Sequence, residues 1–251
     1  MSKKGRDSSR RVKEMQAAQR RAEQRRRNLI VGGVAVAVIA VIVGIGIAVQ
    51  SSRDEAGTVL VPTGTVDKFG IPRGDTSAPV TMDLYEDFQC PVCKMYEGYL
   101  ADTYTKNIDA GTLRIVYRPM AFLNDYSSRA LETAACVLSQ DGSAAYLKLH
   151  DLLFQNQPSE QGPWPSDADL ADLAAQAGAS GSAVADCQAA DTYKGWVKAA
   201  TDAASKAHVV GTPTMFIDGK EVAIVGKNQQ DAIDLVQQTI DTAAAGASST
   251  G

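Results

Sequence analysis

The feature that most constrains the fold is a pair of cysteines separated by two residues, Cys90-Pro91-Val92-Cys93, between two different local patterns. The preceding segment, residues 79–85, is β-branched and alternating, which predicts a strand. The following segment predicts a helix, and a proline is tolerated at its first position because no N–H is needed there. We therefore expect both thiols on the first turn of a helix that directly follows a strand.

This position predicts a redox site. The first thiol lies among unpaired backbone N–H groups at the positive end of the helix dipole, which favours the thiolate, the form that attacks disulfides. We expect Cys90 to form mixed disulfides and the more buried Cys93 to resolve them. The alternatives are a purely structural disulfide and half of a zinc site. Zinc would need a second cysteine pair or nearby histidines, whereas the other two cysteines lie 51 residues apart and the chain has two histidines.

A second motif, Gly211-Thr212-Pro213-Thr214, precedes another predicted strand. A proline at a strand start removes a ladder donor and marks an edge or a cis turn. Only about 5–6% of X-Pro bonds in folded proteins are cis, so an ordinary trans turn is the alternative. Together with the upstream cysteine motif and a downstream Asp218-Gly219 hairpin signal, the pattern predicts a cis bond.

The remaining pattern predicts an α/β fold with a helical block in its middle. The block is divided at 141–142, 158–165 and 178–181. Removing it leaves a βαβ unit and a ββα unit. The predicted strands are 79–85, 113–118, 214–217 and 221–225, and the predicted helices are 90–107, most of 127–207, and 228–244.

The N-terminal part differs sharply from the rest in charge. Residues 1–27 contain 11 basic and three acidic side chains, a charge of +8, and the remainder contains 14 basic and 26 acidic ones, a charge of −12. Directly after the basic segment, Leu29–Val49 is a run of 21 residues without a charge. As a helix this run would span roughly 31 Å. We predict a transmembrane helix, with 1–28 cytoplasmic and 50–251 outside by the positive-inside rule. A cleaved signal peptide is the alternative, but no clear cleavage site follows.

These observations predict five segments. The basic leader is read as a topology signal and the acidic remainder as a solvated surface, so we expect no nucleic-acid binding. The segments are a basic cytoplasmic leader (1–28), a transmembrane helix (29–49), a linker with at most a short opening strand (50–77), a catalytic domain (78–245, with its helical insertion at about 124–207) and a flexible tail (246–251).

Several stretches resemble the DsbA-like branch of the thioredoxin superfamily, in its membrane-anchored Gram-positive and actinobacterial form. They are residues 70–75, 80–93, 149–154 and 211–219. The resemblance implies a thioredoxin fold with an inserted helical domain and disulfide exchange with secreted proteins. It also implies that Pro213 is cis and packs beside Cys90, and that Thr212 offers backbone hydrogen bonds to an extended substrate segment.

The chain departs from that family at two positions. The oxidising archetype has His where this chain has Val92, and the acid that many relatives place six residues before the first cysteine is Leu84 here, although Asp83, Glu86 and Asp87 lie close. The archetype's cysteine has a pKa of about 3.5. Because Val92 adds neither a charge nor a side-chain donor, we predict a pKa for Cys90 below about 7 but above that value.

The other two cysteines, Cys136 and Cys187, lie on predicted helices of the insertion. In an oxidising compartment an even cysteine count favours pairing, so we predict a structural disulfide between them. Two buried free thiols are the alternative. His150 is expected to be packed or half-exposed on an amphipathic helix, and His208 to border the site.

The predicted function is that of an extracytoplasmic thiol:disulfide oxidoreductase, held in the plasma membrane by one helix, which introduces disulfides into exported cysteine-containing proteins. The Cys90–Cys93 disulfide is the redox centre, so we expect no metal and no other cofactor. The resemblance implies reoxidation by a membrane quinone reductase resembling DsbB or vitamin K epoxide reductase. The alternatives are a disulfide reductase or isomerase of the same fold, and a non-catalytic thiol-based binding or copper-handling module.

Overall fold

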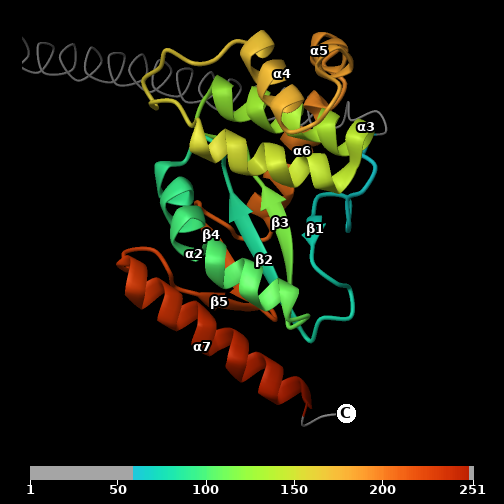
Figure 1. Cartoon of the computed structure of the whole chain (residues 1–251). Helices are drawn as coiled ribbons and strands as arrows, with labels where there is room; N and C mark the ends of the chain where they lie inside the picture. Colours follow the sequence, from blue (N-terminus) through green and yellow to red (C-terminus); the bar gives the residue numbers. More distant parts are fainter. Residues whose placement is uncertain (1–58, 249–251) are drawn as a thin grey trace, which may run out of the picture. The chain divides into compact units, whose positions relative to one another are not determined.

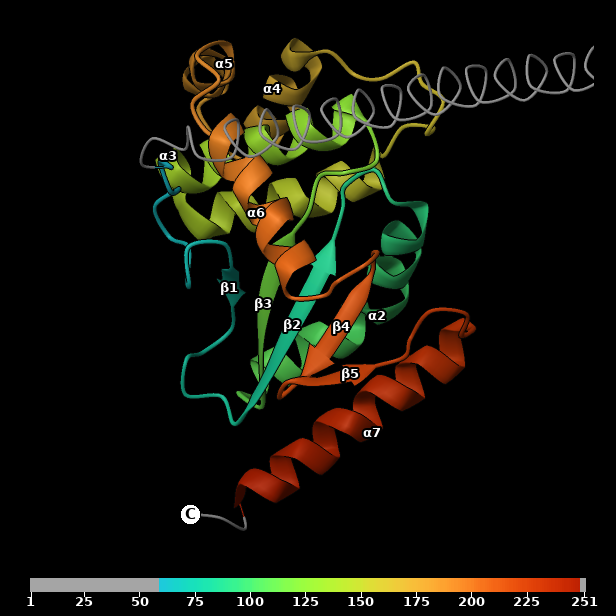
Figure 2. The same cartoon turned by 180° about the vertical axis from the view of Figure 1, so that it is seen from behind.

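The computed structural model describes residues 59–248 (Figures 1 and 2). The basic leader and the Leu29–Val49 run lie outside this range, and none of the helices within it is both long and apolar enough to cross a bilayer. The elements are β1 (Ile71–Arg73), β2 (Val80–Glu86), α2 (Pro91–Asp109), β3 (Leu113–Pro119), α3 (Asp125–Gln155), α4 (Asp167–Gln176), α5 (Gly181–Ala189), α6 (Lys194–Lys206), β4 (Thr214–Ile217), β5 (Lys220–Val222) and α7 (Gln229–Ser248).

The five strands form one sheet in the order β1-β3-β2-β4-β5. β2 and β3 are parallel, with Val80 opposite Leu113 and Glu86 opposite Pro119, and the other pairs are antiparallel. Figure 1 shows α2 in front of the strands, and the reverse view in Figure 2 shows α6 over the other face. This is the predicted thioredoxin fold, βαβ followed by ββα.

The helical insertion consists of α3 to α6. Helices α3, α4 and α5 gather beyond the end of the sheet to which β2 points, and α6 runs back over one face of the sheet (Figures 1 and 2). The observed span of the insertion, 125–206, agrees with the predicted one. α3 is interrupted at Gly142, where φ is 81° and ψ is −178°, a conformation that glycine adopts at little cost. A disulfide joins Cys136 of α3 to Cys187 of α5, with 6.1 Å between their Cα atoms.

The short strand β1 fits the expectation of a short opening strand in the segment 50–77, but the rest of its described part, residues 59–77, is not the free linker that was predicted. Ile71 is fully buried, and β1 pairs with β3. The indole of Trp196 on α6 donates a hydrogen bond to the carbonyl of Lys68 at 2.7 Å. The Gly- and Pro-rich composition was misleading because Pro72 lies on an edge strand, where its missing N–H is harmless.

The C-terminal boundaries also differ from the prediction. α7 continues to Ser248, so residues 246–248 are helical and not part of a flexible tail, in keeping with the high helix propensity of the preceding alanines. β5 ends at Val222, earlier than expected. The carbonyl of Ile224 accepts a hydrogen bond from the Tyr96 hydroxyl at 2.6 Å instead of continuing the ladder.

Candidate active site

The N-terminus of α2 is capped by Cys90 itself. Its backbone is extended (φ −75°, ψ 115°), and its Sγ accepts a hydrogen bond from the backbone N–H of Cys93 at 3.4 Å. This is the position in which Ser, Thr, Asp or Asn normally accepts such a bond. Pro91 follows at the first helical position. The sulfur of Cys90 therefore lies where a helix start favours negative charge.

The surroundings of Cys90 lower the pKa of its thiol to about 6. The largest cause is a hydrogen bond from the Cys93 thiol; burial opposes it, and Thr212 and the backbone N–H groups of Cys93 and Val92 lower the pKa further. The value falls in the range predicted from the sequence. At pH 7 Cys90 is therefore mostly thiolate.

Cys93 has the opposite character. Its side chain is 1% exposed, and burial raises the pKa of its thiol strongly, with further contributions from Cys90 and from the charge of Glu86. Cys93 therefore stays protonated while Cys90 is ionised. Both are free thiols in this structure, and their unequal surroundings give the first the properties of an attacking group and the second those of a resolving group.

The second motif lies directly against Cys90. The Thr212–Pro213 peptide bond is cis, and Sγ of Cys90 lies 3.4 Å from the carbonyl oxygen of Thr212, to which the thiol donates a hydrogen bond when it is protonated. Pro213 is buried. The fold thus brings together two motifs that are about 120 residues apart in the chain, as the resemblance implies. A second cis bond, Gly162–Pro163, was not predicted.

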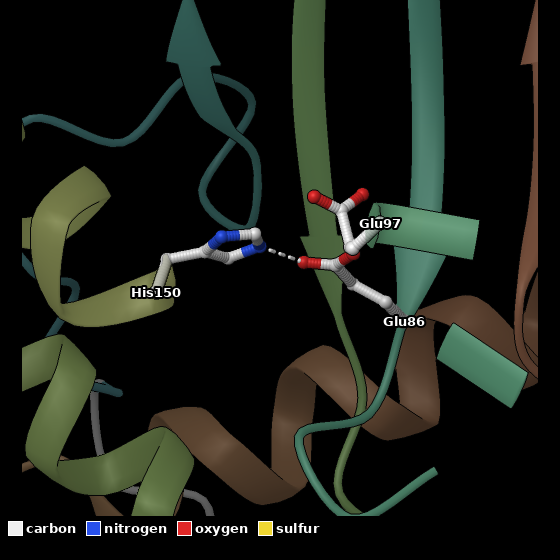
Figure 3. Close-up of side chains that lie close together, drawn as sticks. All are labelled: Glu86, Glu97 and His150. Atoms are coloured by element: carbon white, nitrogen blue, oxygen red, sulfur yellow. Dashed lines mark hydrogen bonds and ion pairs between the residues drawn. The ribbon is translucent and has the colours of Figure 1, made fainter. Parts of the chain in front are cut away.

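A buried ion pair forms a further part of the site, which sequence reasoning missed (Figure 3). Glu86 ends β2 and is 3% exposed, and His150 on α3 is 1% exposed. The Nε2 atom of His150 contacts Oε1 of Glu86, and its Nδ1 atom lies 3.4 Å from Asp151. Burial alone would lower the pKa of His150, but the Glu86 charge and the Asp151 hydrogen bond raise it to about 10. The imidazole is therefore protonated and paired with a carboxylate.

The sequence contains a signal for one member of this pair, Glu86. Alternate residues of β2 are buried, and Glu86 occupies the same face as Leu84. A glutamate at an inward position of a strand needs a partner. What the sequence does not show is that the partner comes from α3, 64 residues later.

A third side chain, Glu97 of α2, lies beside this pair (Figure 3). Burial and the Glu86 charge raise the pKa of Glu97 to about 8. One ligand atom each from Glu86, Glu97 and His150 lies within 4.8 Å of the others, close enough to consider a metal ion. His150 and Glu86 already pair with each other, so a metal would have to displace an ion pair that balances the Glu86 charge.

Among residues 59–248, His208 forms no hydrogen bond or ion pair with Cys90 or Cys93. His208 is exposed at the end of α6. A cavity of about 830 Å³ is lined mainly by α3 and α6 and includes neither Cys90 nor Cys93. The active-site region is therefore the start of α2, the Thr212–Pro213 turn and the Glu86–His150 pair.

A sequence model described as thioredoxin matches residues 67–242. The chain belongs to the thioredoxin family. Over 170 residues it is 25% identical to disulfide bond formation protein D of Bacillus subtilis. This match covers 67% of this chain and 74% of that protein. Over 150 residues it is 31% identical to the Na+/H+ antiporter NhaA 3 of Salinispora tropica, covering 59% of this chain but only 21% of the antiporter.

Among solved structures, the oxidised DsbA of Mycobacterium tuberculosis matches with a TM-score of 0.55 and 28% identity, covering 73% of this chain and 97% of that one. Within the thioredoxin family the chain is therefore a DsbA-like member. With its Cys90–Cys93 site, it is a protein-disulfide oxidoreductase by class.

Proposed function

We propose that this DsbA-like protein introduces disulfides into exported proteins, using the Cys90–Cys93 pair as its only redox group. The observation that carries the proposal is the contrast between the two thiols: the pKa of Cys90 is lowered to about 6, whereas burial raises that of Cys93. A lowered pKa stabilises the dithiol form above that pH and so favours oxidation of the substrate.

The exchange proceeds in two balanced steps. A substrate thiolate attacks Sγ of Cys90, the Cys90–Cys93 bond breaks, and Cys93 leaves and takes up a proton. The second substrate thiolate then attacks the substrate sulfur of the mixed disulfide, and Cys90 leaves as a thiolate. Two electrons pass from the substrate dithiol to the enzyme. The low pKa of Cys90 speeds the second step because a weaker base is a better leaving group.

We propose that this takes place outside the plasma membrane, with the protein anchored by Leu29–Val49. The change in charge from +8 before that run to −12 after it supports this orientation, and the Cys136–Cys187 disulfide supports an oxidising compartment. The substrates are exported proteins with cysteines, and the reoxidant is a membrane quinone reductase resembling DsbB or vitamin K epoxide reductase.

The direction of electron flow is tested by equilibrium with glutathione. A reduction potential above about −220 mV supports an oxidase, and a lower one supports a reductase or isomerase of the same fold. The Cys90 pKa predicts the first outcome.

The activity itself is tested by trapping. In cells that express the full chain with Cys93→Ala, mixed disulfides should accumulate on Cys90, because nothing resolves them. The double variant Cys90→Ala/Cys93→Ala is the control and should carry none. A single variant without adducts would refute the enzymatic proposal and favour a thiol-based binding module.

A further inference from the structure

The segment that leads into the reactive cysteine is held on one side by Asp87. Its side chain is 1% exposed, and its Oδ1 atom accepts a hydrogen bond from the backbone N–H of Gln89 at 2.8 Å. The backbone carbonyl of Asp87 accepts a second one from the N–H of Cys90 at 2.9 Å. These bonds fix N–H groups of the turn between β2 and α2, and its carbonyl groups need other donors.

Two of these carbonyl groups are held by Gln157, which comes from the helical insertion. It follows the end of α3, which lies beside the start of α2 (Figure 1), where the Lys94 ammonium donates a hydrogen bond to the carbonyl of Gln155 at 3.2 Å. The Nε2 group of Gln157 donates to the carbonyl of Phe88 at 2.9 Å and to that of Cys90 at 3.0 Å. A side-chain amide has two N–H donors, so both are committed to the active-site segment.

A second glutamine makes the connection reciprocal. Gln89 is fully buried, and its Nε2 group donates a hydrogen bond to the carbonyl of Pro158 at 2.9 Å. These three bonds, made by the side chains of Gln89 and Gln157, are called the amide clamp below. The clamp joins the turn that carries Cys90 to a loop 69 residues later in the chain.

The amide clamp acts on the backbone that places the Cys90 sulfur. The bond that Sγ of Cys90 accepts from the N–H of Cys93 depends on the extended backbone of Cys90, at φ −75° and ψ 115°. In the oxidised protein the Cys90–Cys93 bond itself holds the sulfur against α2. In the reduced protein only hydrogen bonds hold it there, and this is the form in which the sulfur is charged and the bonds that it accepts are strongest.

We propose that Gln157 is a positioning residue: by holding the carbonyls of Phe88 and Cys90, it keeps the Cys90 sulfur at the start of α2 and stabilises the thiolate. This rests on the proposed exchange activity. The thiolate exists only in the reduced form, so its stabilisation favours reduction of the Cys90–Cys93 bond and hence oxidation of the substrate. The helical insertion thereby takes part in setting the reduction potential.

The test compares the wild type with Gln157→Met, whose side chain has nearly the same length but no donor. In the reduced proteins the pH midpoint of Cys90 alkylation by iodoacetamide should rise from about 6 to about 7, since a lost N-cap interaction is worth about one pKa unit. In equilibrium with glutathione, two glutathione thiols become one disulfide as the Cys90–Cys93 disulfide becomes two thiols. The constant for this exchange should fall about tenfold at pH 8, or about 30 mV in potential. It should not change at pH 5, where Cys90 is protonated in both proteins.

The matched control is Gln155→Met, the same change at an exposed glutamine two residues earlier, which should behave as wild type in both measurements. Gln157→Asn keeps the amide on a shorter chain, disturbs the fold less, and should change both readouts in the same direction by a smaller amount. Unchanged midpoints in both Gln157 variants, or the same change in the glutathione constant at pH 5 and pH 8, would overturn the positioning role and leave Gln157 a structural contact. Cys93→Ala would still trap adducts in that case, so this role can fail without the proposed function failing.

Discussion

The two cysteine pairs of this protein are buried to the same degree yet differ completely in chemistry. Cys90 is 6% exposed and Cys187 7%, while Cys93 is 1% and Cys136 0% exposed. The first pair consists of free thiols on one helical turn, and the second is a disulfide that joins α3 to α5. Exposure therefore does not make Cys90 reactive. What differs is the helix start, the Thr212 carbonyl and the charge beside Cys93.

The comparison implies that the two cysteine pairs can be changed independently. The largest expected effect is the loss of stability when the structural pair is removed. Removing the bridge with Cys136→Ala/Cys187→Ala should lower the free energy of unfolding by about 4 kcal/mol, because a 51-residue loop is no longer closed in the unfolded chain. Denaturant unfolding measures this. The exchange rate at Cys90 should not change below the melting transition; a large fall in that rate would show that the pairs are coupled.

The next largest effect, again on stability, should come from removing the His150 partner of Glu86, the charge beside the reactive pair. His150→Leu leaves the Glu86 carboxylate buried without a partner, which should cost about 3 kcal/mol of stability. Because the pKa of His150 is raised to about 10 in the folded protein, this contribution is complete below about pH 6.5 and is lost as the pH rises through 10. Unfolding measured at pH 6 and at pH 10 should show a smaller deficit at pH 10. Equal deficits would mean that His150 acts by packing alone.

The smallest effect concerns Val92, one of the two residues between the reactive cysteines. In the reduced wild-type protein, alkylation of Cys90 by iodoacetamide should rise with pH and reach half its maximum near pH 6. Val92→His adds a charge and a donor, and should move that midpoint down by about one unit, or about 1.4 kcal/mol. The Cys136–Cys187 pair should remain unmodified throughout. A midpoint above pH 8 in the wild type would contradict the oxidase assignment.

The reactive cysteines were easier to predict than the groups that tune them. Cys90 and Cys93 could be identified from the sequence because two cysteines at this spacing at the start of a helix have few uses. The Glu86–His150 pair could not be found in this way, because the contact depends on how α3 packs against the end of β2. The same limit explains the linker error: Ile71 is apolar and isolated among turn-forming residues, and only its pairing with Tyr117 shows that it belongs to the sheet.

The contact between His150 and Glu86 also has an engineering consequence. The helical block that interrupts the thioredoxin fold supplies the cation for a carboxylate beneath the active site, so it is not a detachable module. A minimised version of this enzyme, or a chimaera with another relative's helices, would have to bring its own positive charge to that position or exchange Glu86 for a neutral residue. Glu86 and the inserted block are therefore expected to change together in the course of evolution.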